Sequence, residues 1–288
     1  MNFEKIINFI DDKYHHKRIV KFLEKYKIYK LIDVGSHKGE FLKNFLKFKN
    51  IKIAYAFEPQ VEIFKILNKN LKKYKKSIIF CPPLPLLTYF SKKNANNNIQ
   101  FGAQNISNTS LSFGAATGSI SASMAKTSGA EYVILGHSES RSSGDSFLMI
   151  KNKILHADKM KLKIIFCIGE TLSQKKENQS LAVLKKQIIG SVSKKINFNN
   201  IIFAYEPVWS IGTGLVPSSE YLEKTFLFLN SYLKNNFKIK SPKILYGGSV
   251  NAVNIKGLRS IKACSGYLVG GASLKAKNFI EIIKNYYN

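Results

Sequence analysis

From residue 78 onward, the sequence alternates between short, continuously apolar runs and longer amphipathic segments. A helix is predicted at 219–235, because Leu222, Phe226 and Leu229 recur on one face. Strands that are apolar throughout and separated by helices indicate a parallel sheet covered by helices. The predicted strands are 78–81, 99–103, 131–135, 162–167, 200–205, 243–246 and 266–269. These strands are one fewer than a closed barrel of eight β/α units requires.

Residues 1–76 differ in style, being dense in Lys, Phe and Ile. Their pattern predicts a helix at 3–27, a strand at 30–34, a helix at 39–48, a strand at 51–57 and a helix at 60–74. We therefore expect two domains, one of residues 1–76 and one of residues 77–288. The predicted fold is α/β: a barrel that is incomplete at its first βα unit, preceded by a Rossmann-like βαβα fragment.

Charge, hydrophobicity and cysteine content indicate which classes of partner the chain binds and which cellular compartment it occupies. The formal net charge is +27, but only three of the 45 basic residues are arginine, so we expect no specific nucleic-acid binding. We expect no membrane span, because no stretch approaches the roughly 20 apolar residues that one needs. The first residues also lack the apolar core of a signal peptide. Cys81, Cys167 and Cys264 are far apart and odd in number, which fits a reducing cytoplasm rather than a disulfide framework.

Glu206 is the first candidate for catalysis. It follows the apolar run 201–205 and precedes the loop Pro-Val-Trp-Ser-Ile-Gly-Thr-Gly, which is rigid at its start and flexible at its end. A carboxylate at a strand tip beneath a closable loop provides a base and a means of excluding water, as proton abstraction needs. Taken alone, the same carboxylate also fits a solvated strand end followed by an ordinary turn.

His137 is the second candidate, because it lies between the predicted strand 131–135 and a helical stretch. The positive end of a helix dipole favours a neutral imidazole that can donate a hydrogen bond. A structural histidine that caps a loop is the alternative. The histidines and cysteines of the chain lack metal-ligand spacing, and we expect no metal site.

Two glycine turns follow the last two predicted strands. They are Gly247-Gly248-Ser249 and Gly270-Gly271. Glycines let backbone N–H groups approach an anion closely. In a β/α barrel, the loops after the last two strands are the usual phosphate site.

With these motifs in place, residues 78–288 resemble triosephosphate isomerase. The resemblance implies a TIM (β/α)8-type barrel that interconverts dihydroxyacetone phosphate and glyceraldehyde 3-phosphate in glycolysis and gluconeogenesis. It also implies a cytoplasmic homodimer that uses no metal or organic cofactor. The matching runs are Cys81-Pro82-Pro83, Gly102 to Asn105, Tyr132 to Glu139, Phe166 to Glu170, Ala204 to Gly214, Tyr246 to Val250 and Gly266 to Leu274, in family order and spacing.

The same resemblance implies roles for individual residues. Glu206 is the base that moves a proton between two carbons, and His137 is the neutral electrophile that polarises the carbonyl. Residues 207–217 form the closing lid. Glu139 and Cys167 are supporting residues, and Cys167 is expected to pack rather than to act as a thiolate. The expected phosphate donors are Gly212, Ser249, Gly270 and Gly271.

The sequence departs from the family at its start. The family's first strand ends in an Asn-x-Lys run whose lysine holds the phosphate, and residues 1–76 contain no similar run at a strand end. Losing a cationic contact to a partly desolvated dianion costs about 10³-fold in rate. Glu139, which pairs with that lysine in the family, would then face the phosphate unpaired. We therefore expect impaired isomerase activity, with an inactive chimera or pseudoenzyme that only binds phosphate as an alternative.

Two further departures concern the dimer interface. Ser119 stands where the family has an acid and Ser140 where it has an arginine, while Thr117 matches the interface loop. Because both charges are absent together, no charge is left unpaired, and a homodimer is still expected.

Residues 31–41 and 54–59 carry a different motif: a strand, a glycine turn and a helix, then a second strand that ends in an acid. This spacing suits a nucleotide-type cofactor and resembles the first half of a class I S-adenosylmethionine-dependent methyltransferase, with Gly35, Gly39 and Glu58 as cofactor contacts. A generic βαβ unit is the alternative. The resemblance stops near residue 76, so a methyltransferase fragment is a rival for the function but methyl transfer is not expected.

Strand 51–57 and helix 60–74 offer one more alternative. They would occupy the place of the lost first βα unit and close the barrel. Glu58 would then lie at the mouth of the barrel, beside the phosphate, where a second negative charge is unfavourable.

Overall fold

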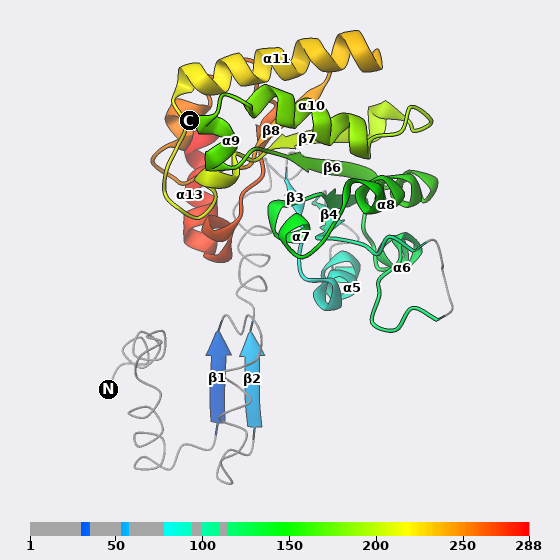
Figure 1. Cartoon of the computed structure of the whole chain (residues 1–288). Coiled ribbons are helices and arrows are strands. Elements are labelled where there is room, and N and C mark those ends of the chain that lie inside the picture. Colours follow the sequence, from blue (N-terminus) through cyan, green and yellow to red (C-terminus); the bar gives the residue numbers. More distant parts are fainter. Residues whose placement is uncertain (1–29, 35–52, 58–77, 94–98, 110–114, 288) are drawn as a thin grey trace. The chain divides into compact units, whose positions relative to one another are not determined.

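The computed structural model describes residues 30–34, 53–57, 78–93, 99–109 and 115–287 (Figure 1). The chain divides into two compact units, Met1–Val61 and Glu62–Asn288. The boundary that we predict near residue 77 falls next to a segment outside the described residues, and it stays a prediction.

The first unit contains two parallel strands. β1 (Lys30–Val34) pairs with β2 (Ile53–Phe57), with Lys30 opposite Ile53 and Val34 opposite Phe57. Both strands are predicted from the sequence, and parallel pairing requires a crossover connection between them. The predicted helices at 3–27, 39–48 and 60–74, and the residues Gly35, Gly39 and Glu58, lie outside the described residues.

The second unit is built on a curled, seven-stranded parallel sheet in the part of the chain that the structure describes. Its order follows the sequence from β3 to β9, and each strand pairs with the next. This confirms the predicted barrel-like α/β fold. The strands are β3 (Ile79–Phe80), β4 (Gln100–Ala103), β5 (Tyr132–Leu135), β6 (Lys163–Ile168), β7 (Ile201–Tyr205), β8 (Lys243–Tyr246) and β9 (Gly266–Tyr267).

Strand β2 pairs with β1 and is not a strand of the seven-stranded sheet. This pairing gives no support to the alternative in which residues 51–57 complete the barrel, and that alternative stays a prediction. Glu58, which this alternative puts at the barrel mouth, lies outside the described residues.

Helices connect the strands and cover the outside of the sheet, as α10 and α11 do in Figure 1. The predicted helix at 219–235 is confirmed as α11, where the Ser218 hydroxyl caps the first turn by accepting from the Tyr221 N–H at 3.2 Å. The helices are α5 (Leu84–Lys93), α6 (Ala122–Thr127), α7 (Ser138–Ser142), α8 (Phe147–Lys159), α9 (Leu172–Lys176), α10 (Ser180–Ser191), α11 (Ser219–Phe237), α12 (Ile255–Leu258) and α13 (Ala276–Tyr287). The 3-10 turns are η2 (Phe198–Asn200), η3 (Val208–Ser210) and η4 (Gly271–Leu274).

The middle strands, β4 to β7, are buried on both faces, which explains their continuous apolar sequence. On β6, Ile165 and Cys167 pack inside the curl with Tyr132 and Ala204. The intervening Phe166 is also fully buried and meets Phe203 of β7 edge to face, with ring centroids 6.0 Å apart. A core on each side of the sheet holds the strand ends in fixed register, and those ends carry the polar residues described below.

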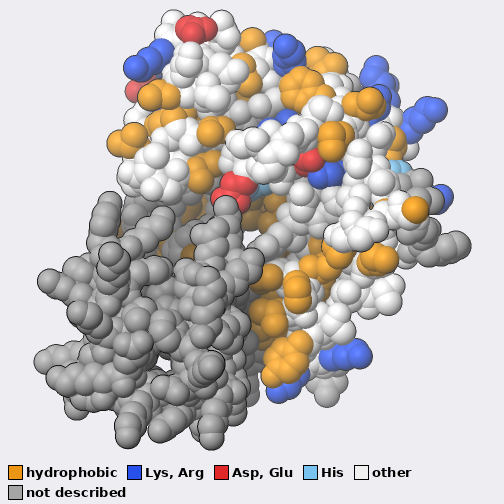
Figure 2. Space-filling view, turned by 60° about the horizontal axis from the view of Figure 1, so that its bottom comes forward, with side chains coloured by type: hydrophobic (Ala, Val, Ile, Leu, Met, Phe, Trp, Pro, Cys, Tyr) orange, Lys and Arg blue, Asp and Glu red, His pale blue; other side chains and the backbone are white. Residues whose placement is uncertain are grey.

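Surface charge is dispersed on the face that Figure 2 presents. Lysine and arginine side chains lie around its rim and do not gather into one stripe. A dispersed positive charge draws anions without marking a nucleic-acid groove. Among the described residues, no helix is both long and apolar enough to cross a membrane.

Candidate active site

The polar residues singled out in the sequence follow strand ends that lie at one edge of the sheet. His137 comes two residues after β5, and Glu206 comes directly after β7. Ser249 lies in the turn after β8, and Gly270 and Gly271 lie in the loop after β9. Because parallel strands present their carboxyl ends at the same edge, residues far apart in sequence meet there.

Glu206 is a buried carboxyl group. Its side chain is almost fully enclosed, at 3% exposure. Burial raises the pKa of Glu206 to about 8, and hydrogen bonds from the Cys167 thiol and the Ser138 backbone N–H lower that pKa only in part. A base whose pKa lies near neutral pH holds a proton strongly enough to take it from carbon, and a fraction of it is ionised at physiological pH.

His137 has a fixed tautomer. Its Nδ1 accepts a hydrogen bond from the Glu139 backbone N–H at 3.3 Å, at the start of α7. Burial lowers the pKa of His137, while the Glu139 charge raises it in part. A neutral imidazole that accepts at Nδ1 carries its proton on Nε2, which is therefore a donor.

These two side chains face each other. His137 Nε2 lies 3.6 Å from Glu206 Oε1, beyond the usual length of a hydrogen bond. A donor and a base at this separation can both contact one molecule of three carbons. The arrangement can move a proton at carbon while holding the adjacent oxygen.

Two glycines make room for Glu206. A Cβ on Gly169 would overlap the Glu206 carbonyl group, and a Cβ on Gly247 would lie 2.6 Å from Glu206 Cγ. The Gln187 side chain fixes Gly169 in turn, by accepting from its N–H and donating to its carbonyl, each at 2.8 Å. Gly169 therefore leaves room for the main chain of Glu206, and Gly247 leaves room for its carboxyl group.

The predicted lid begins with a polar anchor. Trp209 Nε1 donates to the buried Glu170 carboxylate at 2.9 Å, and Lys175 Nζ lies 3.5 Å from the Trp209 ring centroid. The Tyr205 and Tyr221 hydroxyls donate to the same Glu170 oxygen, each at 3.1 Å. Beyond this anchor, residues 212–216 are exposed and Gly212 has a φ of 68°. A rigid start and an exposed, glycine-containing middle suit a segment that moves as a flap.

The predicted phosphate donors lie in three loops. Ser249 is half-buried, and Gly270 and Gly271 are exposed at the start of η4. In this structure the Ser249 N–H and hydroxyl donate to Ser210, at 3.4 Å and 2.5 Å. The supporting residues differ in position. Cys167 is buried against Glu206, and the Glu139 side chain is 87% exposed.

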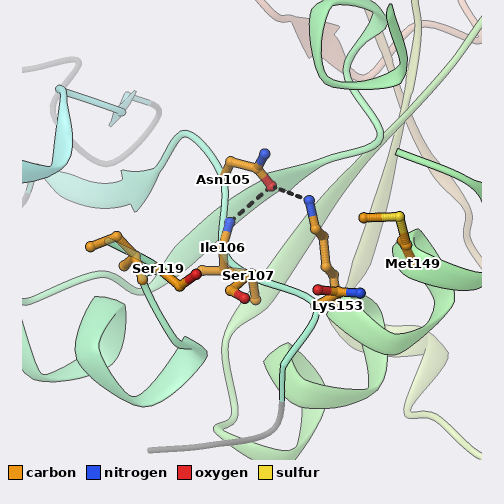
Figure 3. Close-up of a pocket in the computed structure, with 8 residues that line it drawn as sticks. Asn105, Ile106, Ser107, Ser119, Met149 and Lys153 are labelled. Atoms are coloured by element: carbon orange, nitrogen blue, oxygen red, sulfur yellow. Dashed lines mark hydrogen bonds between the residues drawn. The ribbon is translucent and has the colours of Figure 1, made fainter. Parts of the chain in front are cut away.

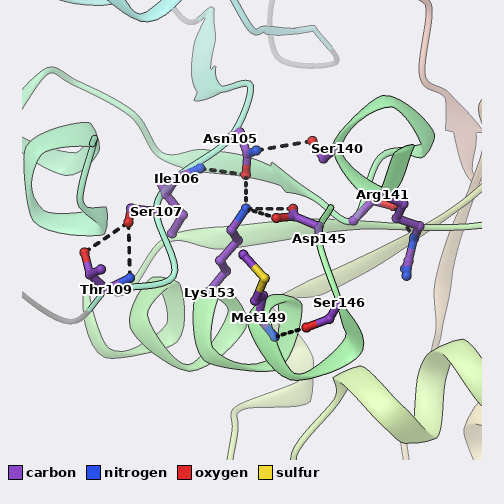
Figure 4. A network of polar contacts seen from close by, with 11 residues as sticks. Asn105, Ile106, Ser107, Thr109, Ser140, Arg141, Asp145, Ser146, Met149 and Lys153 are labelled. Carbon is purple, nitrogen blue, oxygen red and sulfur yellow. Dashed lines mark hydrogen bonds and ion pairs between the residues drawn. The ribbon is translucent and has the colours of Figure 1, made fainter. Parts of the chain in front are cut away.

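Sequence reasoning missed a polar network around the buried side chain of Lys153 (Figure 4). Lys153 of α8 forms an ion pair with Asp145 at 2.6 Å and donates to Asn105 Oδ1 at 3.2 Å. Asn105 Nδ2 then donates to Ser140 of α7, the helix that His137 caps, at 3.2 Å. Nothing in the local sequence separates a buried lysine from the many surface lysines, so only the contact reveals it.

A separate cavity of about 240 Å³ lies next to this network (Figure 3). Its walls include Ser107, Ser119, Met149 and Lys153, but neither His137 nor Glu206. It is therefore not the place where the two groups act together. Across the residues that the structure describes, no group of His, Cys, Asp and Glu is arranged to hold a metal ion, and all three cysteines are free thiols.

Comparison with known proteins gives a consistent result. The family model described as triosephosphate isomerase matches residues 46–286, beginning upstream of residue 78. The triosephosphate isomerase of Bradyrhizobium diazoefficiens is 38% identical over 213 residues, covering 73% of this chain and 84% of that protein. That of Alkaliphilus oremlandii is 35% identical over 240 residues, covering 81% and 96%. The crystal structure of triosephosphate isomerase from Bartonella henselae superposes with a TM-score of 0.71 at 34% identity, covering 79% of this chain and 94% of that one.

Proposed function

The chain belongs to the triosephosphate isomerase family, and on that premise we propose that Glu206 and His137 interconvert dihydroxyacetone phosphate and glyceraldehyde 3-phosphate. The observation that carries the proposal is the facing pair: His137 Nε2 is 3.6 Å from a buried Glu206 carboxyl oxygen, and His137 Nδ1 is occupied by the Glu139 N–H.

The reaction needs two proton movements. The Glu206 carboxylate removes a proton from C1 of dihydroxyacetone phosphate, and the electron pair moves toward the carbonyl oxygen on C2. The His137 Nε2–H donates a hydrogen bond to that oxygen and stabilises the enediolate. Glu206, now protonated, returns the proton to C2, and the hydroxyl proton passes from O1 to O2 through the imidazole. No atoms are gained or lost, so the proposed chemistry requires no co-substrate.

Phosphate recognition is assigned to backbone N–H groups and one hydroxyl. Gly212 of the lid, Ser249, Gly270 and Gly271 are the proposed donors. Glycines permit close approach of the backbone to the three oxygens of the group. The positive charge of the whole chain, +27, favours the approach of a dianion at low salt.

A coupled assay with purified protein tests the function. Wild type is expected to convert either triose phosphate, and Glu206→Gln and His137→Gln are each expected to lose at least about 10²-fold in kcat. The Cys264→Ser variant, which changes a cysteine outside the site, is the matched control. Activity that survives Glu206→Gln would contradict the assignment.

We also propose that the rate is low for this family. No Asn-x-Lys run stands at the end of a predicted strand in residues 1–76, and Glu139 Oε2 lies 3.9 Å from His137 Nδ1 without a lysine or arginine partner among the described residues. A kcat/KM about 10³-fold below that of an intact relative is expected. Glu139→Gln is expected to lower KM, because it removes a negative charge near the phosphate. A wild-type rate equal to that of the relative would contradict this proposal.

The assembly and compartment follow the family. We propose that the protein forms a homodimer, supported by the exposure of the interface-loop residues Thr117 and Gly118. We also propose that it is cytoplasmic, supported by the free thiols of all three cysteines. Light scattering after gel filtration measures the assembly: a mass near twice 32.5 kDa is expected, and a monomer across the concentration range would contradict it.

For residues 1–76 we propose a domain derived from a methyltransferase-like βαβ unit. The support is the parallel pairing of β1 with β2 and the glycine turn and acid that follow them in sequence. Calorimetric titration with S-adenosylmethionine tests whether Gly35, Gly39 and Glu58 still bind a cofactor. No heat above the control titration would contradict retained binding.

A further inference from the structure

Ser210 stands at the end of η3, in the first part of the lid, and its side chain is fully buried. The mechanism above uses none of its atoms. Its hydroxyl nevertheless contacts three groups: the Leu215 carbonyl at 2.6 Å, the Tyr246 hydroxyl at 3.1 Å and the Ser249 N–H at 3.4 Å. A buried hydroxyl with three partners indicates a specific structural task.

The directions of these hydrogen bonds can be assigned. A serine hydroxyl has one proton and two lone pairs. Its proton goes to the Leu215 carbonyl, because a carbonyl can only accept. The Tyr246 hydroxyl must therefore donate to Ser210 Oγ, and the Ser249 N–H takes the second lone pair. The hydrogen-bonding capacity of Ser210 is fully used.

These contacts join two parts of the site. Leu215 lies at the far end of the lid, while Tyr246 ends β8 and Ser249 belongs to the turn after it. Ser249 is held a second time, because its hydroxyl donates to the Ser210 carbonyl at 2.5 Å. Gly248, which precedes Ser249 in the turn, packs against Ser210: a Cβ on Gly248 would lie 2.7 Å from Ser210 Oγ. The lid and the glycine turn are thus locked together through one residue.

We propose that Ser210 is a positioning residue that holds the lid and the Gly247–Ser249 turn together through these hydrogen bonds, and that phosphate must displace it from Ser249. The inference rests on the proposed role of Ser249 as a phosphate donor. The Ser249 N–H cannot serve Ser210 Oγ and a phosphate oxygen at full strength together. Each displaced hydrogen bond reduces the apparent affinity of the phosphate ligand.

Ser210→Ala removes the three hydroxyl contacts and leaves the backbone in place. We expect phosphoglycolate and inorganic phosphate to bind the variant about three- to tenfold more tightly than wild type, the range that corresponds to one hydrogen bond. Tyr246→Phe removes the donor on the other side and is expected to act in the same direction. Because both changes break one network, the double variant should gain less than the sum of the two.

Trp209, the only tryptophan of the chain, is adjacent to Ser210 and reports on the lid without any ligand. In Ser210→Ala, acrylamide is expected to quench Trp209 fluorescence more than in wild type, because the lid is freed. Ser191→Ala is the control, since Ser191 is also fully buried but its Oγ has no hydrogen-bond partner in the part of the chain that the structure describes. Far-ultraviolet circular dichroism and the melting temperature establish that each variant is folded.

The binding measurements and the quenching measurements together distinguish the possible outcomes. Equal quenching in Ser210→Ala and wild type overturns the proposal, whether or not phosphate binds. Unchanged or weaker phosphoglycolate affinity in a folded Ser210→Ala variant also overturns it, because a merely structural serine would give that result. Wild type that binds no phosphoglycolate contradicts the proposed function, while the quenching comparison still decides whether Ser210 holds the lid.

Discussion

His137 and Glu206 face each other across 3.6 Å, although they follow strands β5 and β7 and are separated by most of two β/α units. The imidazole is held neutral by an N–H at Nδ1, and the carboxyl group is desolvated. Each side chain therefore has the protonation behaviour that its proposed role needs.

The rate should depend on pH through Glu206. Its pKa is raised from 4.5 to about 8 by burial, so the free protein has little active carboxylate below that pH. We expect kcat/KM to rise about tenfold per pH unit below pH 8 and to level off above it. A pH profile measured under kcat/KM conditions checks this, and a profile flat between pH 6 and 8 would contradict it.

The same raised pKa affects stability. Between pH 4.5 and about 8, the folded protein binds a proton at Glu206 that the unfolded chain has lost. The contribution of Glu206 to the free energy of unfolding therefore falls as pH rises through this range. Urea unfolding of wild type and Glu206→Gln at several pH values isolates this contribution, because the glutamine does not titrate.

Cys167 should tune the base without acting as a nucleophile. Its buried thiol donates to Glu206 and lowers the Glu206 pKa, against the larger effect of burial. In Cys167→Ala, the midpoint of the pH profile should move upward and the rate at pH 7 should fall. Cys264→Ala, at a half-buried cysteine elsewhere, should leave the midpoint unchanged. A downward shift in Cys167→Ala would refute this role.

Gly247 should be intolerant of any side chain. A Cβ there would lie 2.6 Å from Glu206 Cγ and 3.1 Å from its Oε1. Gly247→Ala is expected to cost about 1–3 kcal/mol of stability and to displace the carboxyl group, lowering kcat more than it raises KM. Gly257→Ala in α12 is the control, because a Cβ there meets nothing within 4 Å. Equal kcat values in both variants would show that the contact has no importance.

Lys153 should be a structural lysine. Lys153→Met leaves the Asp145 carboxylate buried without its partner, and such changes cost about 3–5 kcal/mol. The melting temperature should fall by about 2–4 °C for each of these kcal/mol. Lys159→Met, at an exposed position of the same helix, should change it little. Similar melting temperatures in both variants would contradict the burial of the ion pair.

The sequence predicted strands well where both faces are buried. The run 243–246 matches β8 to the residue, and 200–205 and 162–167 agree with β7 and β6 to within one residue. β3 and β9, at the two ends of the strand order, are shorter than predicted. An apolar run marks where a strand is possible, but the length of the ladder depends on neighbours that the sequence does not identify.

Site residues could be predicted where they follow strands, as Glu206 and His137 do. Contacts across the fold could not. Three such contacts join residues from separate elements. They are the Lys153–Asp145 ion pair, the hydrogen bonds between Gln187 and Gly169, and the hydrogen bond from Trp209 to Glu170. Polar residues of these types are common on surfaces, so no local pattern distinguishes a buried partner from a solvated one.

The packing of Glu206 against the bare backbone of Gly247 has a consequence for redesign. A chemist who wishes to aim this carboxyl group at another substrate has no adjacent side chain to exchange on that side. New specificity would have to be introduced through the lid or through the segment that carries His137, with Gly247 left unchanged.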